Sequence, residues 1–175
     1  MPNEERPKHP SLSNEDIQRV QKVCFDIADE RRLLIALISD TGMRLSEALG
    51  LVWSDVQLKH EYPHIKLVPH PWRQLKTTGS KRLVPLVGEA LRAIKIMHEQ
   101  SLCTKFLFPS YTNEAKCKSN SASAALNKWM KAYIDEGVVH SFRHSFRDRL
   151  RSAEVDTELT DQLGGWAISS IGQGY

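Results

Sequence analysis

Two histidines and an arginine share one short segment near the end of the chain, and their types and spacing suit a phosphate. His140, Arg143 and His144 are spaced i, i+3 and i+4, so a helix places them side by side. Arginine offers planar, permanently charged donors that match phosphate oxygens, and histidine exchanges a proton near neutral pH. Tyr175 follows nine residues after Trp166, in a run of small residues. We interpret this arrangement as a phosphate-binding site to which a nucleophilic hydroxyl is brought.

The same segment carries an apolar face, because Phe142, Phe146 and Leu150 recur every four residues. The helix should therefore pack against a core on that side. The spacing of His140 and His144 also occurs in zinc sites, but no Glu follows His140 and no third ligand is evident. We expect neither a metal nor a cofactor.

The bulk composition is that of a globular protein without special features. The chain has 175 residues, of which 41% are hydrophobic and 26% charged, enough for one domain with a core. A net charge of +3 permits nucleic acid as a partner without demanding it. The three cysteines form no CxxC pair, which fits a reducing cytosol. With no apolar run near the ~18 residues that span a bilayer and no signal-peptide core, the chain is expected to be cytoplasmic.

The hydrophobic periodicity, together with the residues that end helices and strands, predicts a mainly helical α+β domain with one small antiparallel sheet. Residues 1–12, rich in proline and charge, are predicted to be a linker or disordered arm, and residues 13–175 the domain. Gly42 should adopt a left-handed conformation after the second helix. The predicted helices are 13–29, 31–39, 43–51, 88–100, 121–137, one that begins near His140, and 157–163. The predicted strands are 64–68, 74–77 and 82–86, with a turn at 78–80 between the last two.

Two further stretches fit a phosphate site. Arg44 stands at a helix start with Glu47 one turn on to hold it. Lys76 lies on the arm of the predicted hairpin, from which a flexible ammonium could reach a ligand. Taken singly, each has a simpler interpretation: a surface ion pair for Arg44 and Glu47, and a solvated strand edge for Lys76. Trp166 taken alone is a core residue more often than a ligand donor.

In order along the chain, these motifs resemble the catalytic domain of the tyrosine recombinase, or phage integrase, family. The resemblance covers roughly residues 13–175, and five motifs in the right order leave little room for chance. The motifs that carry it are Thr41-Gly-x-Arg44-x-x-Glu47-x-x-x-Leu51-x-Trp53-x-Asp55, Lys76 before Arg82-Leu-Val-Pro-Leu86, His140-x-x-Arg143-His144, and Leu163-Gly164 with Trp166 and Tyr175.

The resemblance implies a role for each principal residue. Arg44 and Arg143 correspond to the arginines that bind the non-bridging oxygens of a scissile phosphate. Tyr175 corresponds to the nucleophile that forms a 3′-phosphotyrosine with DNA, which conserves the bond energy so that rejoining needs no ATP. His140 corresponds to a proton acceptor, and Lys76 to the acid that protonates the departing 5′ oxygen.

The remaining implications concern support and partners. Trp166 stands where many members have a second histidine, and its indole can donate a hydrogen bond but not transfer a proton. Glu47 and His144 match supporting positions. The family implies double-stranded DNA as the partner, a tetramer on DNA for the full-length protein, weak or no association for this fragment, and a bacterial or phage-encoded, nucleoid-associated protein.

Family members usually carry an N-terminal DNA-clamp domain and a tail beyond the tyrosine, neither of which is present in these 175 residues. We therefore expect an excised or truncated catalytic domain of a site-specific recombinase that acts in integration or excision of a phage or mobile element. Two alternatives stay open: a DNA-binding module that no longer cuts, and a type IB topoisomerase, which shares the chemistry. Retention of all six predicted site residues favours the enzyme, and the Gly-Gly-Trp-to-Tyr spacing favours the integrase branch.

Overall fold

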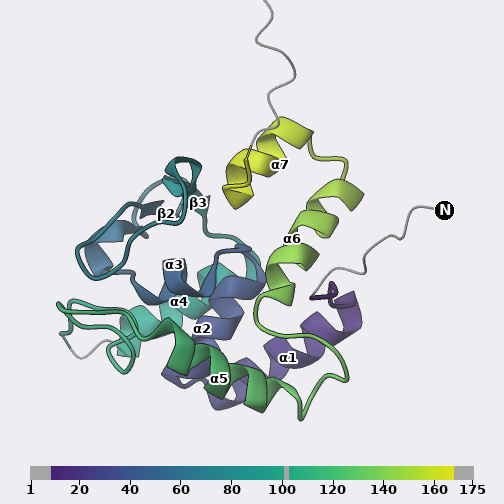
Figure 1. Cartoon of the computed structure of the whole chain (residues 1–175), viewed down its shortest axis with the longest axis horizontal. Helices are drawn as coiled ribbons and strands as arrows, with labels where there is room; N and C mark the ends of the chain where they lie inside the picture. Colours follow the sequence, from purple (N-terminus) through teal and green to yellow (C-terminus); the bar gives the residue numbers. More distant parts are fainter. Residues whose placement is uncertain (1–8, 101–102, 168–175) are drawn as a thin grey trace, which may run out of the picture.

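The structure is a computed structural model that describes residues 9–100 and 103–167. In Figure 1, α6 and α7 run along one side of the molecule, and the small sheet lies across from α7. The elements in chain order are α1 (Asn14–Ile27), α2 (Glu30–Ser39), α3 (Leu45–Leu49), a 3-10 turn (Trp53–Asp55), β1 (Val56–Gln57), β2 (His64–Leu67), a second 3-10 turn (Thr78–Ser80), β3 (Arg82–Pro85), α4 (Gly88–Gln100), α5 (Ser119–Met130), α6 (Ser141–Ser152) and α7 (Thr157–Gly164).

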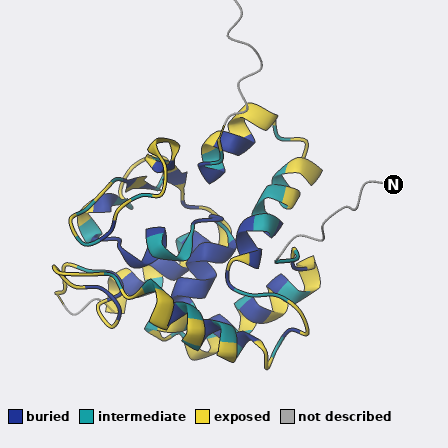
Figure 2. Cartoon of the chain, viewed as in Figure 1, coloured by how far each residue is buried: buried dark blue, intermediate teal, exposed yellow. Residues whose placement is uncertain are grey.

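Helix α2 is the centre of the core. Every residue from 33 to 39 is buried, because the sequence there is apolar on all sides. Helices α1, α3, α4 and α6 pack against it, and Figure 2 shows it as the dark blue middle of the molecule. Asp29 caps its start by accepting a hydrogen bond from the Arg32 amide at 2.9 Å.

The three strands form one antiparallel sheet in the order β1-β2-β3. Ile65 of β2 lies opposite Val84 of β3, and Leu67 lies opposite Arg82. Because paired residues share a face of the sheet, Arg82 points to the same side as the buried Ile65, Leu67 and Val84. This inward position of an arginine matters for the site described below.

The predicted strand at residues 74–77 is wrong, and strand β1 was not predicted. The described sheet consists of β1, β2 and β3, so residues 74–77 do not pair with β3 as the predicted hairpin requires, and the segment after them is a 3-10 turn. Residues 68–81 instead form a long connection between β2 and β3, here called the Lys76 loop. Its base is tied by an isolated bridge between His70 and Arg73, and its end by the 3-10 turn Thr78–Ser80.

Several helix boundaries also differ from the prediction, and two of the differences have a clear cause. Helix α3 begins only at Leu45, because Arg44 has extended backbone and Glu47 accepts its amide hydrogen at 2.9 Å. Helix α5 ends at Met130 rather than near residue 137. Asn127 accepts a hydrogen bond from the Val139 amide at 2.8 Å, which folds the chain back along α5.

The first residues of the described chain rest on α6. Leu12 is buried, and its amide donates to Ser145 Oγ at 2.7 Å, while Ser11 donates to the Asp148 carboxylate. Residues 1–8 of the predicted arm lie outside the described residues. The predicted fold class, a mainly helical α+β domain with a small antiparallel sheet, is confirmed. Within the two described ranges, each helix is too short or too polar to cross a bilayer.

Candidate active site

The turn between α2 and α3 brings Arg44 to the site. Gly42 is left-handed, with φ of 64°, as predicted, and its amide closes the end of α2 on the Ile38 carbonyl at 3.0 Å. A Cβ at Gly42 would lie 2.5 Å from Phe146 Cδ1, so a side chain here would push α6 away. Glycine therefore serves both the turn and the close packing of α6 against it.

Glu47 is a buried carboxylate held between two arginines. Arg44 Nη1 donates to Glu47 Oε1 at 2.8 Å, and Arg82 reaches both carboxylate oxygens, at 3.1 and 3.3 Å. The Glu47 side chain is only 2% exposed. Burial by itself would raise the pKa of Glu47, but the hydrogen bonds and charge of Arg82, and then those of Arg44, lower it below its ordinary 4.5. Glu47 is thus an anion that fixes two guanidinium groups.

Arg143 approaches the same turn from α6. Its Nη1 donates to the carbonyls of Gly42 and Gly164, at 2.8 and 2.6 Å, and the residue is 3% exposed. Among the described residues, no atom accepts a hydrogen bond from its buried Nη2. Burial, and then repulsion from Arg44, Arg82 and Arg147, lower the pKa of Arg143 to about 9, with Glu47 opposing this shift. The group stays a cation at neutral pH.

We call Arg44, Arg82, Arg143 and Glu47 the arginine cluster. Arg44 and Arg82 bond to Glu47, and Arg143 lies near enough to feel its charge, so three cations stand against one carboxylate and the positive charges are not balanced within the cluster. Mutual repulsion between buried cations is relieved when an anion binds among them. A tetrahedral anion with several oxygens would also accept the hydrogen that Arg143 Nη2 leaves free.

The histidines lie at the start of α6, beside the cluster. His140 immediately precedes the helix, and its ring centroid is 5.2 Å from that of His144 and 5.9 Å from that of His9. Partial burial, and then the nearby charges of His144, Arg143, His9 and Arg44, lower the pKa of His140 from 6.5 to about 4. The pKa of His144 is lowered as well, again by burial first. Neutral His140 can accept a proton at physiological pH.

Trp166 lies directly after α7 with its ring against two arginines. The guanidinium carbons of Arg143 and Arg147 are 4.4 and 4.8 Å from the ring centroid. Arg147 is held in turn by Asp161, at 2.9 Å. A Cβ at Gly164 would come within 1.8 Å of the indole, which explains the glycine at that position. The tryptophan thus packs next to the arginine cluster and is half-buried.

Lys76 is placed differently from the other predicted residues. It is exposed on the Lys76 loop, and among the described residues it has no ion pair or hydrogen bond. The base of the loop is well tied, since His70 Nε2 lies 2.9 Å from an Asp55 oxygen and Trp72 donates to the Gly50 carbonyl at 2.9 Å. Tyr175 lies outside the described residues. The structure thus brings together Arg44, Glu47, His140, Arg143, His144 and Trp166, and leaves Lys76 in solvent.

Two residues of this site were missed from the sequence. Arg82 holds Glu47 from β3, and Arg147 stacks on Trp166. A signal for Arg82 was present, because in the strand 82–86 it alternates in phase with the apolar Val84 and Leu86. An arginine on the inner face of a strand needs a buried partner. For Arg147 no such signal existed, since it is one of several arginines on α6.

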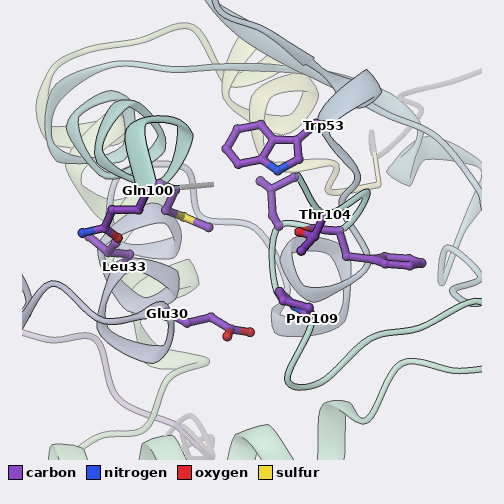
Figure 3. A pocket seen from close by; sticks show the side chains of 9 residues that line it. Glu30, Leu33, Trp53, Gln100, Thr104 and Pro109 are labelled. Carbon is purple, nitrogen blue, oxygen red and sulfur yellow. The ribbon is translucent and has the colours of Figure 1, made fainter. Parts of the chain in front are cut away.

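A cavity beside Trp53 lies apart from the arginine cluster. Figure 3 shows a cavity of about 170 Å³ beside Trp53, lined by none of the predicted site residues. The one carboxylate on its wall, Glu30, is already engaged by the amide and hydroxyl of Ser110, at 3.0 and 2.7 Å. In the parts of the chain that the structure describes, no three histidine, cysteine or acidic side chains come together as a metal site.

Comparison with known proteins gives a consistent result. The profile of the phage integrase family matches residues 10–175. The chain is 27% identical to tyrosine recombinase XerC of Neisseria gonorrhoeae, over 97% of this chain and 57% of the relative. It is 28% identical to tyrosine recombinase XerD of Corynebacterium glutamicum, over 82% of this chain and 47% of the relative. The chain thus spans about half the length of the curated relatives it matches.

Solved structures share the fold. The crystal structure of XerA recombinase superimposes with a TM-score of 0.72 at 19% identity, over 96% of this chain and 58% of that one. A lambda integrase (75–356) dimer bound to a COC′ core site does so with a TM-score of 0.65 at 16% identity, over 97% and 62% of the two chains. Since the family profile covers nearly all of the sequence, the chain belongs to the phage integrase family, whose relatives here are named tyrosine recombinases.

Proposed function

We propose that this chain is the catalytic part of a site-specific recombinase, which cleaves and rejoins DNA strands through a 3′-phosphotyrosine intermediate. The observation that carries the proposal is the arginine cluster, in which Arg44 and Arg82 bond to the single carboxylate of Glu47 and the buried cation of Arg143 lies within its electrostatic reach. Membership of the phage integrase family supports it. The similar structures of XerH and of the Tn1549 integrase hold DNA, and double-stranded DNA is the proposed partner of this chain.

Arg44 and Arg143 would bind the two non-bridging oxygens of the scissile phosphate. Both guanidinium groups are fixed before the substrate arrives, Arg44 by Glu47 and Arg143 by two backbone carbonyls. Pre-organised donors stabilise the extra charge of the pentacoordinate transition state without reorganising during the reaction. A phosphate oxygen would accept the hydrogen bond that Nη2 of Arg143 does not make to any described residue.

The proposed cleavage step is a transfer of the phosphoryl group from DNA to tyrosine. The Tyr175 oxygen attacks the phosphorus and gives its proton to His140, which is neutral at physiological pH. The bond between phosphorus and the 5′ oxygen breaks, and this oxygen takes a proton from Lys76. Attack by a 5′ hydroxyl reverses the sequence and rejoins a strand. Because the phosphotyrosine conserves the bond energy, rejoining would need no ATP. The positive charge that a metal ion could supply would come from Arg44 and Arg143.

The other predicted residues would support this chemistry. Trp166 would donate its indole hydrogen to a phosphate oxygen, and its stacking on Arg143 would keep that arginine in place. Glu47 orients Arg44, and His144 packs beside His140. For the whole protein, we propose a tetramer on DNA and a role in integration or excision of a phage or mobile element.

A covalent trapping experiment tests the proposal without knowledge of the target sequence. The chain is incubated with a library of nicked duplexes randomised around the scissile position, so that cleavage next to the nick releases a short product and traps the adduct. Protein–DNA adducts are recovered in detergent and sequenced. The wild type should enrich one sequence, and Tyr175→Phe should yield no adduct while its fold is unchanged, since loss of one hydroxyl near the end costs little stability.

Tyr62→Phe is the matched control, because Tyr62 is an exposed tyrosine outside the site and its variant should trap DNA as the wild type does. Adducts that persist in Tyr175→Phe would place the nucleophile elsewhere, with Tyr111 and Tyr133 the next to test. Retention of DNA without any adduct from the wild type would identify a binding module. Adducts without sequence preference, together with relaxation of a supercoiled plasmid, would identify a topoisomerase.

A further inference from the structure

Arg82 contacts three separate parts of the molecule. It opens β3 on the inward face of the sheet, and its side chain is 6% exposed. Its guanidinium group donates to the Glu47 carboxylate, to the Ser80 carbonyl at 2.8 Å and, through Nε, to the Leu163 carbonyl at 3.0 Å. These acceptors belong to α3, to the end of the Lys76 loop and to the last turn of α7.

The contact with α7 is reinforced by a second arginine. The last carbonyls of a helix lack partners within the helix and carry partial negative charge, so a cation there is stabilising. Arg82 takes the Leu163 carbonyl, and Arg143 takes the next one, of Gly164, at 2.6 Å. A Cβ at Gly165 would lie 2.6 Å from Arg82 Nη1, so the following residue is a glycine that lets the guanidinium group approach.

The other end of this connection is Arg44. Glu47 accepts hydrogen bonds from Arg82 and Arg44 at the same time, and the Glu47 side chain is 2% exposed. Arg82 donates to both carboxylate oxygens, and Arg44 donates to one through Nη1 and to the other through its backbone amide, which leaves little freedom for any of the three groups. A continuous path of hydrogen bonds therefore runs from the Leu163 carbonyl through Arg82 and Glu47 to Arg44.

We propose that Arg82 is a positioning residue for strand cleavage: it fixes the last turn of α7, from which the chain continues to Tyr175, relative to the phosphate-binding Arg44. The inference rests on the proposed strand cleavage. It predicts that Arg82 affects the rate of the chemical step rather than the affinity for DNA. It also predicts that lysine cannot replace it, because one ammonium cannot span Glu47 and the Leu163 carbonyl in the geometry of the fork.

The first test needs no DNA and follows α7 directly. The amides of Gly165 and Trp166 donate to Gln162 and Asp161 carbonyls in the helix end that Arg82 holds. Hydrogen–deuterium exchange of the peptide covering residues 157–167 should be faster in Arg82→Met and Arg82→Lys than in the wild type. The matched control is Arg92→Met, an arginine on the exposed side of α4 whose ion pair with Glu89 lies outside the site. Unchanged exchange in both Arg82 variants would overturn the proposal.

The second test measures adduct formation on the nicked duplex that the wild type enriches. Displacement of reacting groups by about 1 Å can cost about 10²-fold in rate, so Arg82→Met and Arg82→Lys should form adduct about 10²-fold more slowly at saturating DNA. The DNA concentration for half-maximal rate should stay close to that of the wild type. A wild-type rate for Arg82→Lys, or a change confined to the half-saturating concentration, would contradict the positioning role.

Arg82→Met leaves Glu47 with one partner fewer and could unfold the chain. The double variant Arg82→Met/Glu47→Gln removes the buried charge together with its partner, and circular dichroism checks its fold. If Arg82 acts through Glu47, this variant should cleave no more slowly than Arg82→Met alone, since both changes break the same path. A loss equal to the product of the two single losses would refute the path. Absence of adduct from the wild type, by contrast, counts against the proposed function, and the exchange experiment still decides whether Arg82 holds α7.

Discussion

Arg143 and Lys76 are both predicted to touch the scissile phosphate, and the fold holds them in opposite ways. Arg143 is 3% exposed, bonds two carbonyls and stacks on Trp166. Lys76 is exposed and, among the described residues, has no hydrogen bond or ion pair. The difference matches the two proposed roles. Stabilising a transition-state charge requires a donor fixed in advance, whereas a proton donor has to reach a leaving oxygen whose position depends on the bound DNA.

The two regions also differ in what a mutation can disturb. In the arginine cluster Arg44 and Arg82 bond to Glu47, and Arg143 bonds to backbone carbonyls of two elements, so a single change affects both the site and its stability. In the Lys76 loop, contacts at His70 and Trp72 hold the base and Ser80 is hydrogen-bonded to Thr77 and Arg44, while the Lys76 side chain bonds to no described residue. A mutation of Lys76 can therefore separate chemistry from stability, and a mutation in the cluster cannot.

The largest effect is expected for Arg143→Ala. Removing a pre-organised donor should slow adduct formation on the order of 10³-fold. The carbonyls of Gly42 and Gly164 would also lose their donor, at about 1–3 kcal/mol each in the free energy of unfolding if they stay buried. Single-turnover adduct assays and urea unfolding measure the two losses. Wild-type cleavage in this variant would remove Arg143 from the phosphate site.

Lys76→Ala should lower cleavage without lowering stability. If Lys76 protonates the departing 5′ oxygen, its loss should slow cleavage of normal DNA by about 10²-fold or more. A 5′-bridging sulfur leaves without a proton, so the variant should cleave that substrate at nearly the wild-type rate. Arg143→Ala should show no such rescue, because its charge acts on the phosphorane. Equal slowness on oxygen and sulfur would make Lys76 a DNA-positioning residue, and the acid would be sought at Lys81 or His140.

The local part of this site could be predicted from the sequence. Spacing on one helix placed His140 next to His144, the first-turn pair placed Glu47 against Arg44, and the turn identified Gly42 as left-handed. All of these depend on residues at most four apart, where helix and turn geometry decide the arrangement. The roles given to these residues stay predictions.

Contacts between elements could not be predicted in the same way. The strand at 74–77 was wrong because strand propensity says nothing about whether two segments pair, and in the described sheet β3 pairs with β2 alone. The contact of Arg82 with α7 depends on β3 lying against that helix, which no local pattern reveals. The low pKa of His140 likewise arises from the density of cations that only the fold assembles.

Substitution of two glycines, one beside the arginine cluster and one in the Lys76 loop, compares the stability of the two regions without involving the chemistry. Gly42, in the turn beside the cluster, has positive φ, and a Cβ there would meet Phe146 at 2.5 Å. Gly42→Ala should cost about 1–2 kcal/mol for the backbone and a further ~1–3 kcal/mol for overpacking. Gly79, in the Lys76 loop, has no atom within 4 Å of an added Cβ, so Gly79→Ala should stay within about 0.5 kcal/mol of the wild type. Equal effects in thermal unfolding would show that the turn is not rigid.

An effect confined to pH below neutral is expected from the protonation of His140. Its pKa is about 4 in the folded chain and near 6.5 when unfolded, so between these values the unfolded state binds more protons. The stability that the folded chain gains from a neutral His140 is fully present above pH 6.5 and is lost as the pH falls toward 4. His140→Asn should therefore lose less stability than the wild type over that window, measured by urea unfolding at successive pH values. A His140 ring resonance that titrates near 6.5 in the folded, DNA-free chain would contradict the cationic surroundings assigned to it. If a phosphate binds in the cluster, inorganic phosphate should move that midpoint upward, because an added anion favours the protonated ring.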